Sequence, residues 1–92
     1  MPQVFKVGSY FVYFWSNEGD PLEPCHVHIA LGSPTANATK VWITKSGRCL
    51  LCNNNSHIPS KVLGNIMSVI EARNTDVISK WIDYFGIINY YC

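Results

Sequence analysis

Residues 16–31 read SNEGDPLEPCHVHIAL and carry the most unusual chemistry of the chain. The first half is turn material, because Asn, Gly, Asp and two prolines sustain neither a helix nor a central strand. From Cys25 onward polar and apolar residues alternate, which is the period of a half-buried strand. Side chains two apart on a strand point to the same face, so we expect His26 and His28 to project together.

Four further segments on either side of this stretch have strand character. The aromatic run YFVYFW has strand length and suits a pleated surface. Gly47 lies in a tight turn and predicts a hairpin between the two strands that flank it. The segments are residues 4–7, 10–15, 39–44 and 48–52.

After residue 57 the hydrophobic period becomes helical. Apolar residues recur at spacings of three and four through two segments, which Asn74-Thr75-Asp76 separates and the second of which it can cap. Pro59 suits the first helical position, with Ser56 as a nearby cap, and Gly86 predicts the end of the second helix. The apolar tail, residues 87–92, is either a last strand or a segment pinned to a surface.

Strands over about residues 3–52 followed by helices over about residues 59–86 predict one α+β domain spanning residues 1–92. We expect a small antiparallel β-meander with two α-helices packed on one face. Hydrophobic residues make up 48% of the chain, which is ample for a core. Charged residues make up only 14%, so we expect a partner or a second copy to cover part of the surface.

The net charge of +1 gives no broad basic footprint for phosphates and argues against an acidic mimic of DNA. The N-terminus lacks the pattern of a signal peptide, and no apolar run reaches the length of a membrane helix. We therefore expect a cytoplasmic protein whose four cysteines are mostly reduced. In that compartment, cysteines close to histidines indicate metal ligands before they indicate disulfides.

A zinc site is the first chemical hypothesis. Cys49-x-x-Cys52 has the spacing that lets two thiolates reach one ion, and His26 and His28 complete a tetrahedral set. Cys25 and His57 are reserve ligands. The alternative is that the cysteines are small buried hydrophobes and the histidines are a hydrogen-bonded pair. Strand register bears on this choice, because Cys49 and His28 cannot share an ion from opposite faces of a sheet unless a bulge intervenes.

The second hypothesis is acid–base cleavage of RNA by His26 and His28, with Glu18 or Glu23 nearby. Histidine suits this chemistry because its pKa lies near neutrality. The sequence offers no dense cluster of Arg or Lys to hold a phosphate, which weighs against an enzyme. The third hypothesis is a protein-binding surface, with Tyr90 and Tyr91 of the tail as its anchors, since exposed aromatic residues are typical of interfaces.

Several short motifs run through the chain: Met1-Pro2, the aromatic strand, Ser16-Asn17-Glu18-Gly19, Glu23-Pro24-x-His26-x-His28 and Trp81-x-x-Tyr84-Phe85-Gly86. On these residues the chain resembles the family catalogued as domain of unknown function 4160, which comprises short bacterial and phage-borne proteins. That resemblance implies a small α+β fold and an accessory-gene setting, in which members sit beside a second small gene and have been proposed as toxin–antitoxin components. Small proteins of similar build also occur among inhibitors of phage-defence nucleases. The family has a second proline where this chain has Cys25, and the Cys49-x-x-Cys52 pair is outside its pattern.

Together these observations predict a non-enzymatic protein-binding module of a mobile-element or phage genome, braced by zinc. Its most concrete form is an inhibitor of a bacterial defence nuclease, of the anti-CRISPR kind. The alternative is a toxin that cleaves RNA through the His-x-His strand and has a cognate antitoxin. The charge does not indicate a nucleic-acid partner, and a homo-oligomer is compatible with the low charge.

Overall fold

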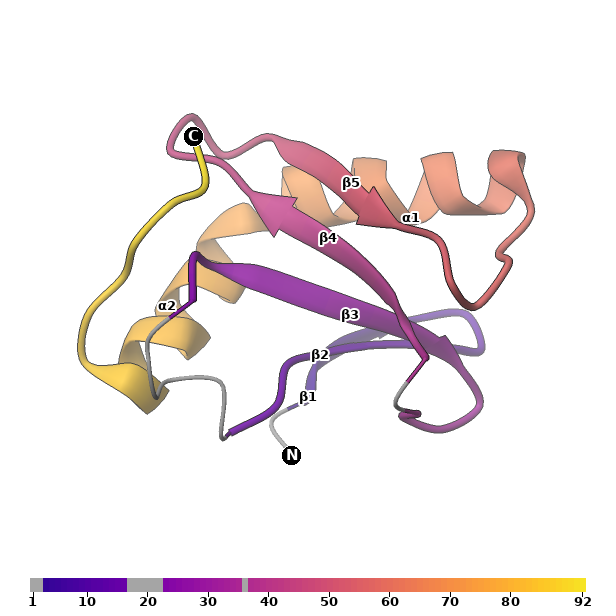
Figure 1. The fold of residues 1–92 in the computed structure, drawn as a ribbon, viewed down its shortest axis with the longest axis horizontal. Coiled ribbons are helices and arrows are strands. Elements are labelled where there is room, and N and C mark those ends of the chain that lie inside the picture. The colour runs from indigo at the N-terminus through magenta and orange to yellow at the C-terminus, as the bar shows by residue number, and fades with distance from the viewer. Residues whose placement is uncertain (1–2, 17–22, 36) are drawn as a thin grey trace.

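The computed structural model describes residues 3–16, 23–35 and 37–92, which form a twisted sheet with two helices on one of its faces (Figure 1). Each strand pairs antiparallel with the next, so the spatial order of the five strands is their order in the sequence. The predicted α+β meander is therefore confirmed. The strands are β1 (Gln3–Val7), β2 (Tyr10–Tyr13), β3 (His26–Leu31), β4 (Thr39–Ile43) and β5 (Cys49–Asn53).

The helices are α1 (Ser60–Ala72) and α2 (Asn74–Phe85), and their N-terminal ends differ from the predicted caps. Pro59 lies immediately before α1 and no side chain caps that helix. The hydroxyl of Ser56 instead lies 2.6 Å from the hydroxyl of Thr39, because the loop folds back on β4. Gly86 ends α2 with a φ of 75°, as predicted, a conformation that glycine adopts without steric cost.

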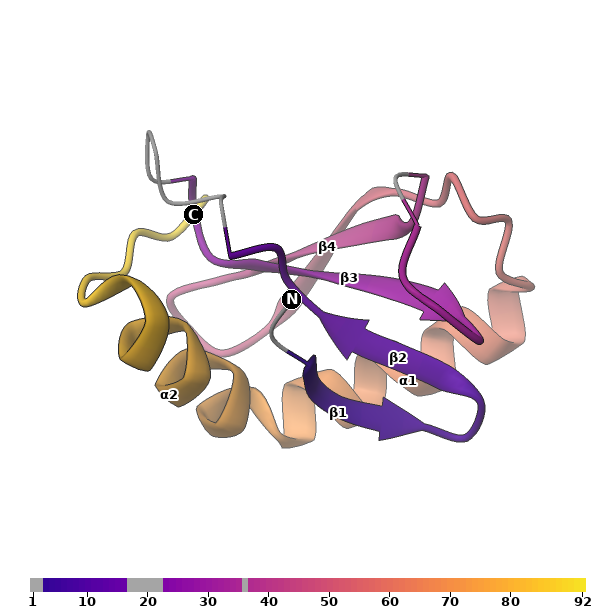
Figure 2. The same cartoon turned by 90° about the horizontal axis from the view of Figure 1, so that it is seen from below.

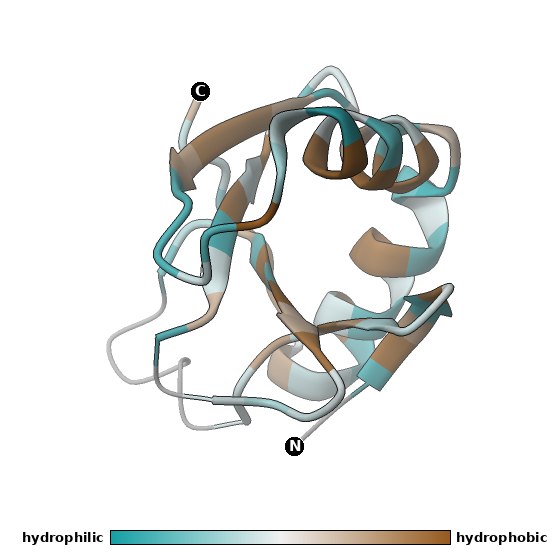
Figure 3. Ribbon diagram, turned by 90° about the vertical axis from the view of Figure 1, so that its right-hand side faces the viewer, coloured by the Kyte–Doolittle hydropathy of each residue, from teal (hydrophilic) through white to brown (hydrophobic). Residues whose placement is uncertain are grey.

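The core lies between the sheet and the helices. In Figure 2 both helices are on the same side of the strands, and Figure 3 shows the twisted sheet curving around them. Alternate residues of each strand face the helices, as the period of two requires. Both helices contribute an apolar stripe, with Ile66 and Ile70 from α1 and Trp81 from α2 almost completely buried. The sheet contributes Val12, Val27, Ile29, Val41 and Ile43.

The opposite face of the sheet, here called the open face, carries no helix in the described part of the chain. A second, smaller hydrophobic cluster lies on it, formed by Tyr13, Ala30 and Ala38 with Phe11 and Trp15 packed around them. The hydroxyl of Tyr13 donates to the carbonyl oxygen of Thr35 and accepts from its N–H, both at 3.3 Å. This pair of bonds holds the loop after β3 against the sheet.

Residues 87–92, all of them described, form no strand. They leave the end of α2 and run up the side of the sheet to the turn between β4 and β5 (Figure 1). Of the two predicted alternatives, the pinned segment is therefore confirmed. Among the described residues, no helix is long and apolar enough to cross a membrane.

Candidate functional site on the open face of the sheet

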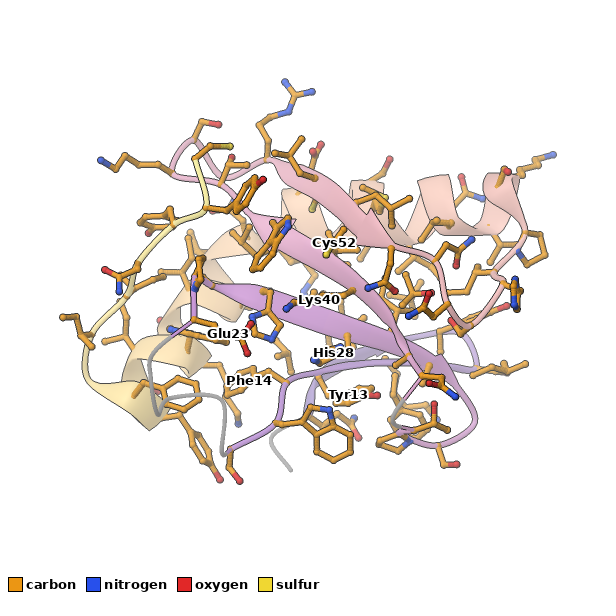
Figure 4. The ribbon with its side chains drawn as sticks, viewed as in Figure 1. Tyr13, Phe14, Glu23, His28, Lys40 and Cys52 are labelled. Atoms are coloured by element: carbon orange, nitrogen blue, oxygen red, sulfur yellow. The ribbon has the colours of Figure 1, made fainter. Side chains whose placement is uncertain are left out.

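Strand register brings three polar side chains into one row across the open face. Tyr13 of β2 is opposite His28 of β3, and His28 is opposite Lys40 of β4. Figure 4 shows the three residues following one another across the sheet. Directly opposite residues of an antiparallel pair have Cβ atoms about 5 Å apart, so neighbours in this row are in contact range.

A continuous series of ring contacts, here called the ring chain, crosses the same face. Successive centroids are 5.3, 5.6, 5.0, 5.8 and 4.9 Å apart, which is the range of favourable aromatic pairs. Most contacts are edge-to-face or tilted, and the last is a parallel stack at 7°. Each ring is thus held by its neighbours. In order, the ring chain consists of Trp15, Tyr13, His28, His26, Trp42 and Tyr91.

The two histidines share a face as predicted, but their surroundings differ. His26 is completely buried, whereas His28 is partly exposed. β2 ends opposite His28, so that strand does not flank His26, and Trp81 of α2 reaches its ring with centroids 5.2 Å apart. Nδ1 of His26 lies 2.9 Å from the carbonyl oxygen of Pro24, which only accepts, so Nδ1 carries the proton. Of the two rings, His28 is the one within reach of a ligand from solvent.

The indole nitrogen of Trp81 is a buried donor with no hydrogen-bond partner in the described part of the chain. Its indole and the ring of His26 meet at 65°. Trp81 therefore acts as a packing support for His26 from the core side.

Lys40 links the row to the ring chain. Its ammonium is 2.9 Å from a carboxylate oxygen of Glu23 and 4.4 Å from the ring centroid of Trp42. The side chain of Lys40 is only 18% exposed, so its charge is partly desolvated and both contacts gain in strength. The pair with Glu23 leaves this part of the face with little net charge.

The structure separates the predicted zinc ligands. Cys49 pairs with Ile43 of the core, and its thiol lies 3.7 Å from the carbonyl oxygen of Met67 in α1. It therefore faces the helices, while His26 and His28 project on the other side of β3. The pairing of β4 with β5 has a bulge between Lys40 and Val41, but Cys49 lies before it in the ladder. As a set, the four predicted ligands do not converge on one point.

The other predicted ligands are also dispersed. Cys52 and His57 are exposed, and Cys25 is buried in the core. No three His, Cys, Asp or Glu side chains come together as a metal site in residues 3–16, 23–35 and 37–92. Of the two acids in the RNA-cleavage hypothesis, Glu18 lies outside the described residues and Glu23 pairs with Lys40. Zinc binding stays a prediction.

Burial controls the chemistry of the two core cysteines. Desolvation raises the pKa of Cys25 to about 12. The pKa of Cys49 is raised to about 12 by desolvation first and by the Glu71 carboxylate second, and the Arg48 guanidinium lowers it in part. Both residues are therefore neutral thiols at physiological pH.

Of the two tail residues predicted to bind a partner, Tyr91 is 59% exposed and ends the ring chain, and Tyr90 is half-buried. The sequence pattern does not single out Tyr13, Lys40 and Trp42 as members of one site. For Lys40 and Trp42 the available signal is the alternation of residues 39–44, whereas Tyr13 lies in a continuous aromatic run that does not show which side chains face outward. The sequence does not reveal the strand register, which places Tyr13, His28 and Lys40 opposite one another.

Comparison with known proteins identifies one family. The family model described as Domain of unknown function (DUF4160) matches residues 9–82. No curated protein and no solved structure matches the chain.

Proposed function

The chain belongs to the family described as Domain of unknown function (DUF4160), and we propose that it is a protein-binding module that uses the open face of its sheet. The observation that carries this proposal is the ring chain, whose members Trp15, His28, Trp42 and Tyr91 are at least partly exposed. Tryptophan and tyrosine dominate the binding energy of protein interfaces. Rings already held by their neighbours lose little conformational entropy on binding.

In its concrete form, the partner is a bacterial defence nuclease, and this protein inhibits it in the anti-CRISPR manner. The net charge of +1 supports binding to protein surface and not imitation of DNA, which requires a dense negative field. The ion pair of Lys40 and Glu23 beside Trp42 also supports binding to a protein surface. Because the two charges neutralise each other, the aromatic rings provide the main contact for a partner.

The burial of His26 weighs against the alternative, an RNA-cleaving toxin that divides acid and base roles between His26 and His28. A general acid or base has to come within hydrogen-bond distance of its substrate, and a completely buried ring does not do so without rearrangement. His28 and Lys40 are opposite each other and remain the residues on which a cleavage mechanism would have to depend.

An inhibition assay tests the proposal. Purified protein is added to an RNA-guided DNA nuclease, and cleavage is compared for the unsubstituted chain, Trp15→Ala and His28→Ala. We expect inhibition by the unsubstituted chain and roughly tenfold weaker inhibition by each variant, which is the effect of losing a binding hot spot. Lys61→Ala and Lys80→Ala, exposed on the helices, are the controls and should inhibit within about twofold of the unsubstituted chain.

Near-ultraviolet circular dichroism shows whether each variant keeps its packed rings. Inhibition that is insensitive to Trp15→Ala and His28→Ala would remove the open face from the proposal. Expression of the chain alone in bacteria distinguishes the binding module from the RNA-cleaving toxin. A binding module should leave growth unchanged. Growth arrest that His28→Ala relieves in a folded protein would replace the proposal by the RNA-cleaving toxin.

A further inference from the structure

The tail, residues 87–92, contacts the sheet through main-chain hydrogen bonds at two points. The N–H of Cys25, just before β3, donates to the carbonyl oxygen of Asn89 at 2.7 Å. The N–H of Lys45, just after β4, donates to the carbonyl oxygen of Cys92 at 2.9 Å. Sheets bind extended peptides through main-chain hydrogen bonds, in known cases along an exposed edge strand. Here the two donors lie instead at the neighbouring ends of two interior strands, β3 and β4.

Between these two points the tail places a ring on the open face. Tyr91 stacks on Trp42 with ring centroids 4.9 Å apart and planes at 7°. Trp42 is presented rigidly for this contact, since the ring of His26 and the ammonium of Lys40 also hold it. The three contacts of the tail therefore follow one another along the chain. The carbonyl group of Asn89 comes first, the ring of Tyr91 two residues later and the carbonyl group of Cys92 directly after it.

The tail is lightly held compared with the core. Ile87 and Tyr91 are 58% and 59% exposed. Ile88 packs against the core but, like Tyr90, is only partly buried, so no residue of the tail is fully enclosed. A hollow of about 430 Å³ lies between the β4–β5 turn and Cys92, and a second of about 610 Å³ is lined by Lys45 and residues 88–90 and 92. Segments with few buried contacts open at a free energy well below that of global unfolding.

We propose that the Trp42 ring and the N–H groups of Cys25 and Lys45 form a peptide-docking site, and that the tail is its intramolecular occupant. The partner is an extended segment of another protein with an aromatic side chain in the position of Tyr91. Its ring stacks on Trp42, and its carbonyl groups accept from the two N–H donors. This inference rests on the proposed function, because it assigns the part of the open face that a protein partner engages and the chemistry it recognises.

The fit of the tail itself supports this occupant, since it shows that an extended aromatic segment satisfies both donors and the ring at once. The residues of the family match end at 82, before the tail, while all three recognition groups lie inside the match. A short tether gives the tail an effective concentration on the order of millimolar, so a partner segment competes only if it binds more tightly or if the tail is weakened.

A peptide competition experiment on the full chain tests the inference. The probe is a synthetic peptide of residues 87–92 with Cys92→Ser, titrated into the unsubstituted chain and into Tyr91→Ala. We expect the peptide to bind Tyr91→Ala up to several-fold more tightly, because the competing ring of the tail is gone. A probe that also carries Tyr91→Ala should bind several-fold more weakly, as the loss of one aromatic pair predicts.

Tyr84→Ala is the matched control, because Tyr84 is an exposed tyrosine of α2 whose ring contacts are with Phe14 and Phe85. It should bind the probe no better than the unsubstituted chain. Amide and indole shifts in nuclear magnetic resonance spectra should concentrate at Cys25, Trp42 and Lys45. Equal affinities of Tyr91→Ala and the unsubstituted chain, or shifts elsewhere, would overturn the docking site.

The result is independent of any nuclease. Peptide binding at Trp42 without nuclease inhibition would retain the docking site and remove the proposed inhibitor function. Nuclease inhibition without peptide binding would retain the proposed inhibitor function and remove the docking site. The open face would then bind the nuclease through other contacts.

Discussion

At the scale of single residues, burial divides chemically identical side chains into different roles. His26 is enclosed and hydrogen-bonded to Pro24, whereas His28 is partly exposed two residues later. The four cysteines divide in the same way, with Cys25 and Cys49 buried and the other two exposed. His26 and His28 occupy equivalent positions of the same strand period. The difference in their exposure therefore comes from what packs against each ring.

The cysteines give a prediction at this scale. A thiol reacts with disulfide reagents as the thiolate, and burial raises the pKa of Cys25 and Cys49 to about 12. We expect Ellman's reagent at pH 8 to label the exposed Cys52 and Cys92 in the native protein, and to reach the other two only after unfolding. Four thiols that react at one rate under native conditions would contradict the assignment.

At the scale of elements, one carboxylate joins the edge strand β5 to α1. Oε2 of Glu71 accepts from the N–H of Cys49 at 2.8 Å and lies 3.4 Å from Nε of Arg48. The N–H of Cys49 points away from β4, because Ile43 opposite it donates its own N–H to Cys25 on the other side. Glu71 therefore satisfies a donor at the sheet edge that would otherwise be open to another chain.

Removal of this contact is predicted to destabilise the fold. Glu71→Ala should lower the free energy of unfolding by about 1.5–3 kcal/mol, the range for a hydrogen bond to a charged group. Glu71→Gln keeps an oxygen acceptor and should cost less. Urea unfolding measures both, and Asp76→Ala serves as control, because its pair with Arg73 is exposed and worth about 0.5 kcal/mol. An equal loss for Glu71→Ala and Asp76→Ala would contradict the role of Glu71.

At the scale of the whole molecule, the two buried thiols make stability depend on alkaline pH. Their pKa is higher in the folded protein, about 12, than the ordinary value of 9.0. Between these values the unfolded chain releases protons that the folded chain keeps. The stabilisation is therefore complete below pH 9 and falls as the pH rises toward 12.

We expect the free energy of unfolding to decrease in this window by up to about 1.4 kcal/mol per pH unit for each thiol. Cys25→Ala removes one such group, so its stability should fall less steeply with pH, whatever fixed loss the smaller side chain causes. Denaturant unfolding at several pH values from 8 to 11 measures the slope. A slope unchanged by Cys25→Ala would show that the buried thiol does not contribute.

Local pattern was sufficient for the elements of this protein. Strand alternation, the helical stripes and Gly86 predicted the meander, the two helices and the end of α2, and all are present. The shared face of His26 and His28 follows from the strand period alone. The predicted cap at Ser56 was wrong because its hydroxyl found a tertiary partner, Thr39, which local sequence does not reveal.

The sequence by itself therefore determined which residues form strands and helices and that the two histidines project together, because these depend on neighbours along the chain. Only the tertiary structure decided that Cys49 faces away from the histidines, that Trp81 encloses His26 and that Tyr91 stacks on Trp42. Each of these depends on strand register or on the path of a distant segment. Such contacts are set by packing of the whole core, and no local period encodes them.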